Sequence, residues 1–189
     1  MQKAREQVSP PLVVVSEPPK TGGGEALTPG AAQFYSAVVN PQPTAVVIHC
    51  SDPRFQTAFR EFIETELGLS DGQYIPFVIA GGAGVLSRPE ALPKEFRFMR
   101  ERLELFREHF KSIRRVILIN HEDCAYYHSL CEKSWALRTL AHLLPRDDMK
   151  LIAQVFHRLL SHLGMQVELY HAKFSDDERT RIVFERIEQ

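Results

Sequence analysis

The chain has 189 residues, 23 lysines and arginines against 24 aspartates and glutamates, and 44% apolar side chains. A chain of this length and composition can bury its own core, which excludes a wholly disordered protein and a mini-protein held together by disulfides. The net charge of −1 gives no support to nucleic acid or a membrane surface as a partner. No apolar run approaches the roughly 20 residues of a transmembrane helix. The three cysteines favour a reducing, cytoplasmic compartment and metal-binding or reactive thiols.

Residues 1–43 are rich in proline and glycine, which interrupt regular helices and strands. We expect an extended arm here, with Val13–Val15 as a possible edge strand and a short helix around Ala31–Val39. A regular alternation of apolar patterns begins at Thr44. The predicted organisation is therefore an N-terminal arm over residues 1–43 and one α/β domain over residues 44–189.

Short apolar runs typical of buried parallel strands occur four times, at Thr44–Cys50, Tyr74–Ala80, Arg115–Asn120 and Met165–Phe174. Pro76 places the second run at a sheet edge, because proline donates no hydrogen bond to the ladder. Arg181–Ile187 alternates apolar and polar residues, so we expect a fifth strand that forms a hairpin with the fourth.

Helical spacing of apolar residues predicts helices over Phe55–Leu67, Lys94–Lys111, Ser134–Leu144 and Asp147–Leu163. Pro145 separates the last two, and Asp147 or Asp148 is expected to cap the final helix. Gly81, Gly82 and Gly84 predict a flexible loop.

Strands that alternate with helices are typical of a doubly wound α/β fold. The prediction is a mainly parallel sheet of about four strands, with an antiparallel fifth strand at its edge and helices on both faces. Ligands of such sheets bind beyond the carboxyl ends of the strands, where the strand order reverses.

Two groups of reactive side chains follow predicted strands. Cys50 ends the first strand, and His121 and Cys124 follow the third. Two thiolates and one imidazole suit a tetrahedral Zn²⁺ ion, and three protein ligands leave one position open, as in catalytic zinc sites. Cys131 has no His or Cys partner in the stretch that follows it, so we expect it to be structural.

Asp52 and Arg54 extend this candidate site. Alternate residues that leave a strand can point to one side, so Cys50, Asp52 and Arg54 are expected to face one pocket. Asp52 would either occupy the open zinc position or accept a hydrogen bond from the zinc water. Arg54 would hold the carboxylate away from the metal through a bidentate pair.

These motifs resemble those of the β-class carbonic anhydrases, whose signature is Cys-x-Asp-x-Arg followed by His-x-x-Cys. The chain has Cys50-Ser51-Asp52-Pro53-Arg54 and His121-Glu122-Asp123-Cys124, and the resemblance covers about residues 44–175. It identifies the chain as a divergent member of that family.

The resemblance implies zinc on Cys50, His121 and Cys124, with Asp52 and Arg54 as the catalytic dyad. It implies a lyase (carbonate dehydratase) in which zinc-bound hydroxide converts carbon dioxide to bicarbonate, and a homodimer or higher homo-oligomer. Departures from the pattern occur at Val78–Gly82 and at Asn120 and Ala125, which flank the second motif. They leave open a related enzyme acting on carbon disulfide or carbonyl sulfide, or a non-catalytic zinc-binding homologue.

Other enzyme classes fit the motifs less well. A cysteine phosphatase needs an arginine six residues after its cysteine, where this chain has Gln56, and Asp52 would repel a phosphate. A Rossmann module needs G-x-G-x-x-G, which Gly81–Gly84 does not provide.

Two further histidines, His128 and His171, are possible proton shuttles because of their placement in the sequence.

Overall fold

The computed structural model describes residues 35–132 and 144–188. The chain divides into two units, Met1–Ala37 and Val38–Gln189, and the second contains the fold described here. The expected strand at Val13–Val15 and helix at Ser134–Leu144 fall almost wholly outside the described residues. Residues 35–39 of the short helix expected around Ala31–Val39 are not helical.

One five-stranded sheet forms the centre of this unit, in the order β2-β1-β3-β4-β5. The bounds are β1 Ala45–Cys50, β2 Tyr74–Ile79, β3 Arg115–His121, β4 Gln166–Phe174 and β5 Ile182–Ile187. The first four strands are parallel and β5 pairs antiparallel with β4. The mixed sheet confirms the predicted α/β fold, including the edge position of β2, which contains Pro76.

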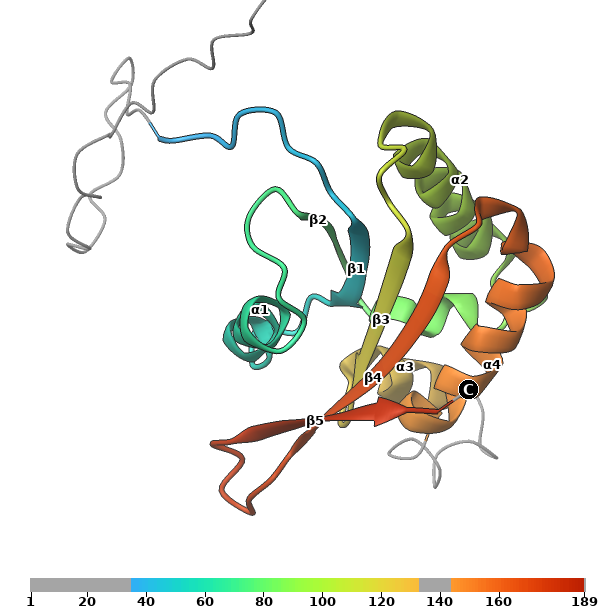
Figure 1. The fold of residues 1–189 in the computed structure, drawn as a ribbon. Coiled ribbons are helices and arrows are strands. Elements are labelled where there is room, and N and C mark those ends of the chain that lie inside the picture. Colours follow the sequence, from blue (N-terminus) through green and yellow to red (C-terminus); the bar gives the residue numbers. More distant parts are fainter. Residues whose placement is uncertain (1–34, 133–143, 189) are drawn as a thin grey trace, which may run out of the picture. The chain divides into compact units, whose positions relative to one another are not determined.

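Helices cover both faces of the sheet, as Figure 1 shows. Helix α1 (Gln56–Thr65) packs on one face, where Phe59 and Ile63 join the buried residues Val47, Ile117 and Ile119. The other face carries α2 (Pro93–His109) and α4 (Leu144–Leu159), and a short helix, α3 (Ala125–Glu132), follows β3.

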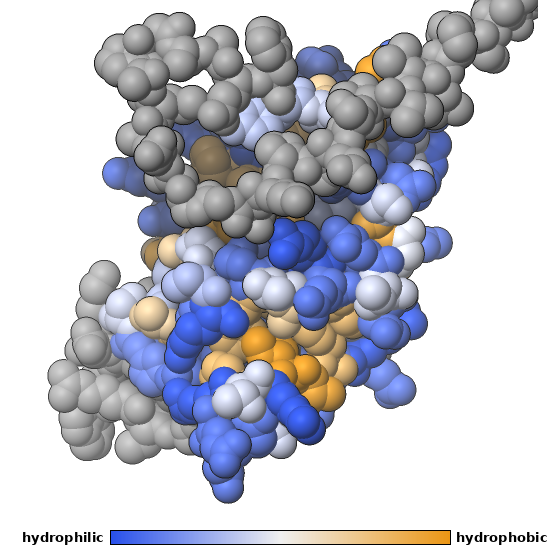
Figure 2. Space-filling view, turned by 90° about the vertical axis from the view of Figure 1, so that its left-hand side faces the viewer, coloured by the Kyte–Doolittle hydropathy of each residue, from blue (hydrophilic) through white to orange (hydrophobic). Residues whose placement is uncertain are grey.

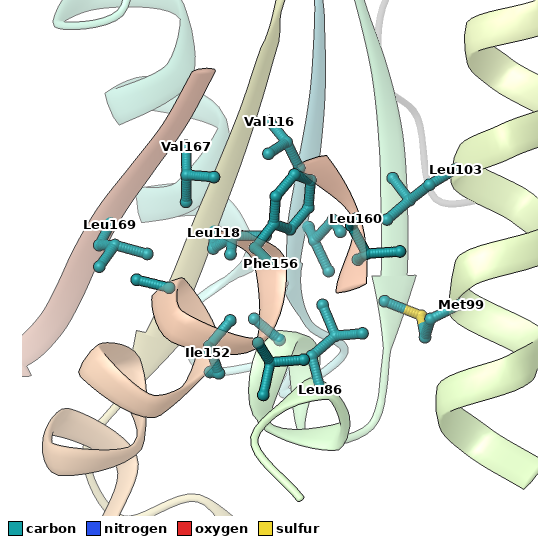
Figure 3. Close-up of a cluster of buried hydrophobic side chains, with 14 of the residues drawn as sticks. Leu86, Met99, Leu103, Val116, Leu118, Ile152, Phe156, Leu160, Val167 and Leu169 are labelled. Atoms are coloured by element: carbon teal, nitrogen blue, oxygen red, sulfur yellow. The ribbon is translucent and has the colours of Figure 1, made fainter. Parts of the chain in front are cut away.

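The larger core lies between the sheet and α2 and α4. Residues Met99 and Leu103 of α2 and Ile152 and Phe156 of α4 meet Leu118 of β3 there, all buried (Figure 3). A buried aliphatic or aromatic side chain contributes about 1.5–3 kcal/mol relative to an exposed one. This core therefore fixes the strands whose carboxyl ends carry the candidate site.

Three local expectations were wrong. The glycine segment is a buried 3-10 helix, η1 (Gly82–Leu86), because it packs into the main core. Helix α4 begins at Leu144, ahead of both expected caps, and Asp147 lies in its first turn. Asp148 instead lies buried, where it accepts a hydrogen bond from the Ser87 hydroxyl at 2.9 Å and pairs with Arg88.

The end of α4 also differs from the prediction. The helix stops at Leu159, and a 3-10 turn (η3, Ser161–Leu163) follows it. Gly164 closes this turn in the left-handed conformation, with φ at 62°. No described helix is long and apolar enough to cross a membrane.

Candidate metal centre

The three predicted metal ligands come together where the order of the strands reverses. Strand β1 lies between β2 and β3, so Cys50 at its end and His121 at the end of β3 reach the same edge of the sheet. Cys124 follows in the turn that leads into α3. Their ligand atoms all lie within 4.8 Å of one another, and all three residues are buried.

The spacing of these atoms fits a four-coordinate metal ion. The two sulfurs are 3.8 Å apart. Two thiolates bound at about 2.3 Å to a tetrahedral zinc would be separated by about the same distance. The cluster can therefore hold a metal without a rearrangement of the backbone.

His121 presents one free nitrogen to this cluster. Its Nδ1 lies 2.7 Å from the carbonyl oxygen of Glu122, which fixes that nitrogen as the hydrogen-bond donor. Its Nε2 is buried and has no hydrogen-bond partner among the described residues. An unpaired buried nitrogen is costly, so a metal bound at Nε2 would remove an unfavourable feature of the fold.

The sulfur of Cys50 lies in surroundings that favour a thiolate. A hydrogen bond from the Cys124 thiol, assisted by backbone N–H groups that include Gly81, lowers the pKa of Cys50 well below its usual value. The same sulfur–sulfur hydrogen bond raises the pKa of Cys124. The two sulfurs thus share one proton, which a dication bound between them would displace.

The glycine turn after β2 closes around Cys50. Gly81 has a φ of +80° and donates its N–H to the Cys50 sulfur at 3.4 Å. A Cβ atom at this position would lie 2.4 Å from the ring of Tyr126. Only glycine fits both the backbone conformation and the space, so this position supports the thiolate directly.

Asp52 and Arg54 form the bidentate pair that the sequence suggests. Arg54 Nη2 lies 2.7 Å from Asp52 Oδ2, and Arg54 Nε lies 3.1 Å from Asp52 Oδ1. Hydrogen bonds from Arg54 hold the pKa of Asp52 below its usual value of 3.8. The carboxylate is thus ionised at neutral pH and held by the guanidinium.

A second carboxylate, Asp123, also binds Arg54 and was not identified from the sequence. Its Oδ2 accepts hydrogen bonds from Arg54 Nη1 and from Arg179 Nη1, both at 2.8 Å. His128 Nε2 lies 3.0 Å from Asp123 Oδ1. We call these four residues, Arg54, Asp123, His128 and Arg179, the Asp123 network.

Tyr127 packs against the cysteines of the centre, a role that no sequence pattern indicates. Its ring packs with Cys50 and Cys124 and is 1% exposed. Its hydroxyl accepts a hydrogen bond from Asn120 Nδ2 at 3.0 Å. The side chain of Cys131 lies outside the described residues.

Comparison with known proteins gives results for structures but not for sequences. No family model and no curated protein matches the chain. A β-carbonic anhydrase from Trichomonas vaginalis is 14% identical, with a TM-score of 0.43, over 82% of this chain and 87% of that one. Tetrameric β-carbonic anhydrases from Sordaria macrospora are 15% identical, with a TM-score of 0.41, over 76% and 80%. The enzyme CafD of Aspergillus fumigatus is 14% identical, with a TM-score of 0.40, over 78% and 91%.

Proposed function

We propose that this protein is a zinc lyase that interconverts carbon dioxide and hydrogencarbonate. One observation carries the proposal: the last residue of β1 is a buried candidate metal ligand, Cys50, and the turn that follows at once supplies the ion pair of Asp52 with Arg54. A structural zinc site needs only ligands, whereas this site adds an ionised carboxylate in a fixed orientation.

Zinc held by Cys50, His121 and Cys124 would act as a Lewis acid that makes water nucleophilic at neutral pH. Asp52 would accept a hydrogen bond from that nucleophile and so orient it toward the carbon of the substrate. Arg54 keeps the Asp52 carboxylate in place and away from the metal. Asp123 fixes the far side of the Arg54 guanidinium, so that its Nε and Nη2 stay directed at Asp52.

The test is stopped-flow hydration of carbon dioxide by the zinc-loaded protein. We expect activity in the wild type and in Arg60→Gln, which removes an exposed arginine of α1. Arg54→Gln should retain zinc and lose most of the activity. A wild type that binds zinc but hydrates no carbon dioxide would contradict the proposal.

A second substrate class should be tested in the same assay, because two bulky rings pack beside the metal cluster. The rings of Tyr126 and Tyr127 lie close together, 5.7 Å between centroids, and both pack with Cys50 and Cys124. Hydrolysis of carbon disulfide or carbonyl sulfide in the absence of carbon dioxide hydration would assign the site to that substrate class. No turnover of any of the three would leave the non-catalytic zinc-binding alternative.

We also propose that the protein is cytoplasmic and forms a homodimer. Figure 2 shows an apolar patch ringed by hydrophilic side chains on the face at the left of Figure 1. Separately from this patch, Val78 lies beside α1 on the edge strand β2 and is 41% exposed, and Phe98 of α2, on the other face of the sheet, is 44% exposed. Exposed apolar surface of this kind favours association. Sedimentation should give a dimer that deletion of residues 1–30 weakens, whereas a strictly monomeric wild type at micromolar concentration would contradict this.

A further inference from the structure

A cleft that is separate from the candidate metal ligands lies beside the sheet. It has a volume of about 750 Å³ and lies between the first turn of α4, the end of β4 and strand β5. None of Cys50, His121 and Cys124 lines it. A volume in this range accommodates a small-molecule ligand.

Four cations line this cleft. Arg146 and Lys150 come from α4, Lys173 comes from β4 and Arg186 comes from β5. The N-terminal end of α4, a helix of 16 residues, adds the partial positive charge of the helix dipole. Together these groups form a site for negatively charged oxygens.

Acidic side chains also line the cleft, and two of them are already bonded. Glu185 pairs with Lys173 and lies 3.6 Å from Arg146. The Oε1 of Glu122 accepts the backbone N–H of Phe174. Asp147 and Glu188 are the other acidic residues of the wall. Walls of mixed charge favour a ligand that accepts hydrogen bonds and also donates one.

One buried side chain beside the cleft has a polar atom without a partner. His171, which lines the cleft, is 5% exposed, and its Nδ1 has no hydrogen bond among the described residues. Glu185 Oε2 makes no hydrogen bond there either, and its ion pair with Arg146 is long, at 3.6 Å. His171 and Glu185 are opposite each other in the β4–β5 register, so their side chains share one face of the sheet. Unpaired buried polar atoms are costly and indicate that something else binds there.

His171 is suited to a neutral hydrogen-bonding role. Burial, and then the charge of nearby Arg146, lower its pKa to about 4. A neutral imidazole carries one donor and one acceptor, so it can bond to a ligand oxygen without adding charge.

We propose that this cleft binds a small oxyanion that keeps one hydroxyl hydrogen, the class of hydrogenphosphate and hydrogencarbonate. Its charged oxygens accept hydrogen bonds from Arg146, Lys150 and Lys173. Its hydroxyl donates to Glu185 Oε2, and His171 Nδ1 bonds to a further oxygen. The bound anion therefore satisfies the buried atoms and the cations together.

The direct test is titration calorimetry of the zinc-loaded protein with inorganic phosphate, with sulfate and with hydrogencarbonate. Phosphate should bind at one site per chain. Sulfate, which has no hydroxyl hydrogen at neutral pH, should bind at least about tenfold more weakly, because Glu185 Oε2 would face a sulfate oxygen that donates no hydrogen bond. Equal binding of sulfate and phosphate, or no binding of phosphate, would overturn the proposal. Comparison of phosphate with hydrogencarbonate shows which of the two oxyanions the site prefers.

Matched variants locate the site. Arg146→Gln should weaken phosphate binding by about tenfold, and Lys150→Gln, at an exposed helical position, should also weaken it. Arg158→Gln removes an exposed arginine nearer the other end of α4, one that pairs with Glu90, and should leave binding unchanged. Equal losses in Arg158→Gln and Lys150→Gln would mean non-specific attraction and overturn the site.

Nuclear magnetic resonance of the histidine rings separates this cleft from the metal centre. Phosphate should shift the ring signals of His171, identified by their absence in His171→Gln. Shifts confined to His121 would place the anion at the metal and contradict the proposal. Loss of carbon dioxide hydration with intact phosphate binding would count against the proposed function alone.

Discussion

The metal cluster and the Asp123 network are joined at one edge of the sheet but are built differently. The three candidate ligands are at most 5% exposed, and they come from two short motifs at strand ends. The side chains of the Asp123 network are 31–56% exposed, and the side chains that bind Asp123 come from the turn after β1, from α3 and from the β4–β5 hairpin. Because the cluster is buried, loss of one ligand should abolish metal binding. Because the network is exposed, its ion pairs should be weak and sensitive to salt.

The largest effect should follow from removal of a ligand. Cys124→Ser should abolish stoichiometric zinc binding and destabilise the fold, because a buried cluster of three cannot replace a lost thiolate. Cys131→Ser makes the same chemical change at the third cysteine and should keep about one zinc per chain. Metal analysis after dialysis measures both, and full zinc retention in Cys124→Ser would reject the assignment.

The next effect concerns the pair beside the cluster. Asp52→Asn and Arg54→Gln should each retain zinc and reduce carbon dioxide hydration by about a hundredfold, because they misplace the group that orients the nucleophile. Stopped-flow assays on protein of measured zinc content test this, with Arg60→Gln as the control. Wild-type rates in either variant would make the pair purely structural.

Asp123 should matter less, because it acts through Arg54. Asp123→Asn should retain zinc and lower the hydration rate by about tenfold, since the amide cannot hold two guanidinium groups as tightly. Added salt should reduce the wild-type rate toward that of the variant, because the network is exposed. If Asp123→Asn instead loses zinc, Asp123 supports the metal loop itself.

A substitution at Tyr127 tests the packing around the buried metal cluster. Tyr127→Phe keeps the ring that packs on Cys50 and Cys124 but removes one of the two acceptors of Asn120 Nδ2, the other being the Pro145 carbonyl oxygen. We expect a loss of about 1 kcal/mol in the free energy of unfolding, with zinc retained. Urea unfolding of the zinc-loaded proteins measures this loss, and an unchanged stability would mean that the bond to Pro145 satisfies Asn120 Nδ2 alone.

The smallest effect is a pH dependence of stability. Hydrogen bonds from Arg54, and then from His128 and Arg179, lower the pKa of Asp123 from 3.8 to about 2. A lowered carboxyl pKa stabilises the fold above the ordinary value, and this contribution disappears as the pH falls from 3.8 through about 2. Asp123→Asn should therefore flatten the curve of unfolding free energy against pH in that window. Above the window the variant should be less stable than the wild type by a constant amount, with the slope of the curve unchanged.

The Asp52–Arg54 pair likewise stays ionised at neutral pH. Carbon dioxide hydration should therefore rise with pH only through ionisation of the nucleophilic water.

Sequence patterns were informative where the chemistry is local. Apolar runs gave the strands, Pro76 gave the edge position of β2, and the spacing of Cys50, His121 and Cys124 gave the cluster. Contacts between residues far apart in the sequence could not be predicted. Nothing in the sequence near Arg179 indicates that the β4–β5 hairpin brings this residue to Asp123. Asp148 shows the same limit, because a residue typical of a helix cap became the buried partner of Ser87 once α4 packed on η1.

X-ray absorption at the zinc edge tests the central claim most directly. The zinc-loaded wild type should show two sulfur ligands at about 2.3 Å and the remaining ligands, nitrogen or oxygen, at about 2.0–2.2 Å. Cys50→Ser should lower the sulfur count or lose the metal, and Cys131→Ser should leave the spectrum unchanged. A wild-type shell with four sulfurs, or with none, would contradict a metal centre formed by Cys50, His121 and Cys124.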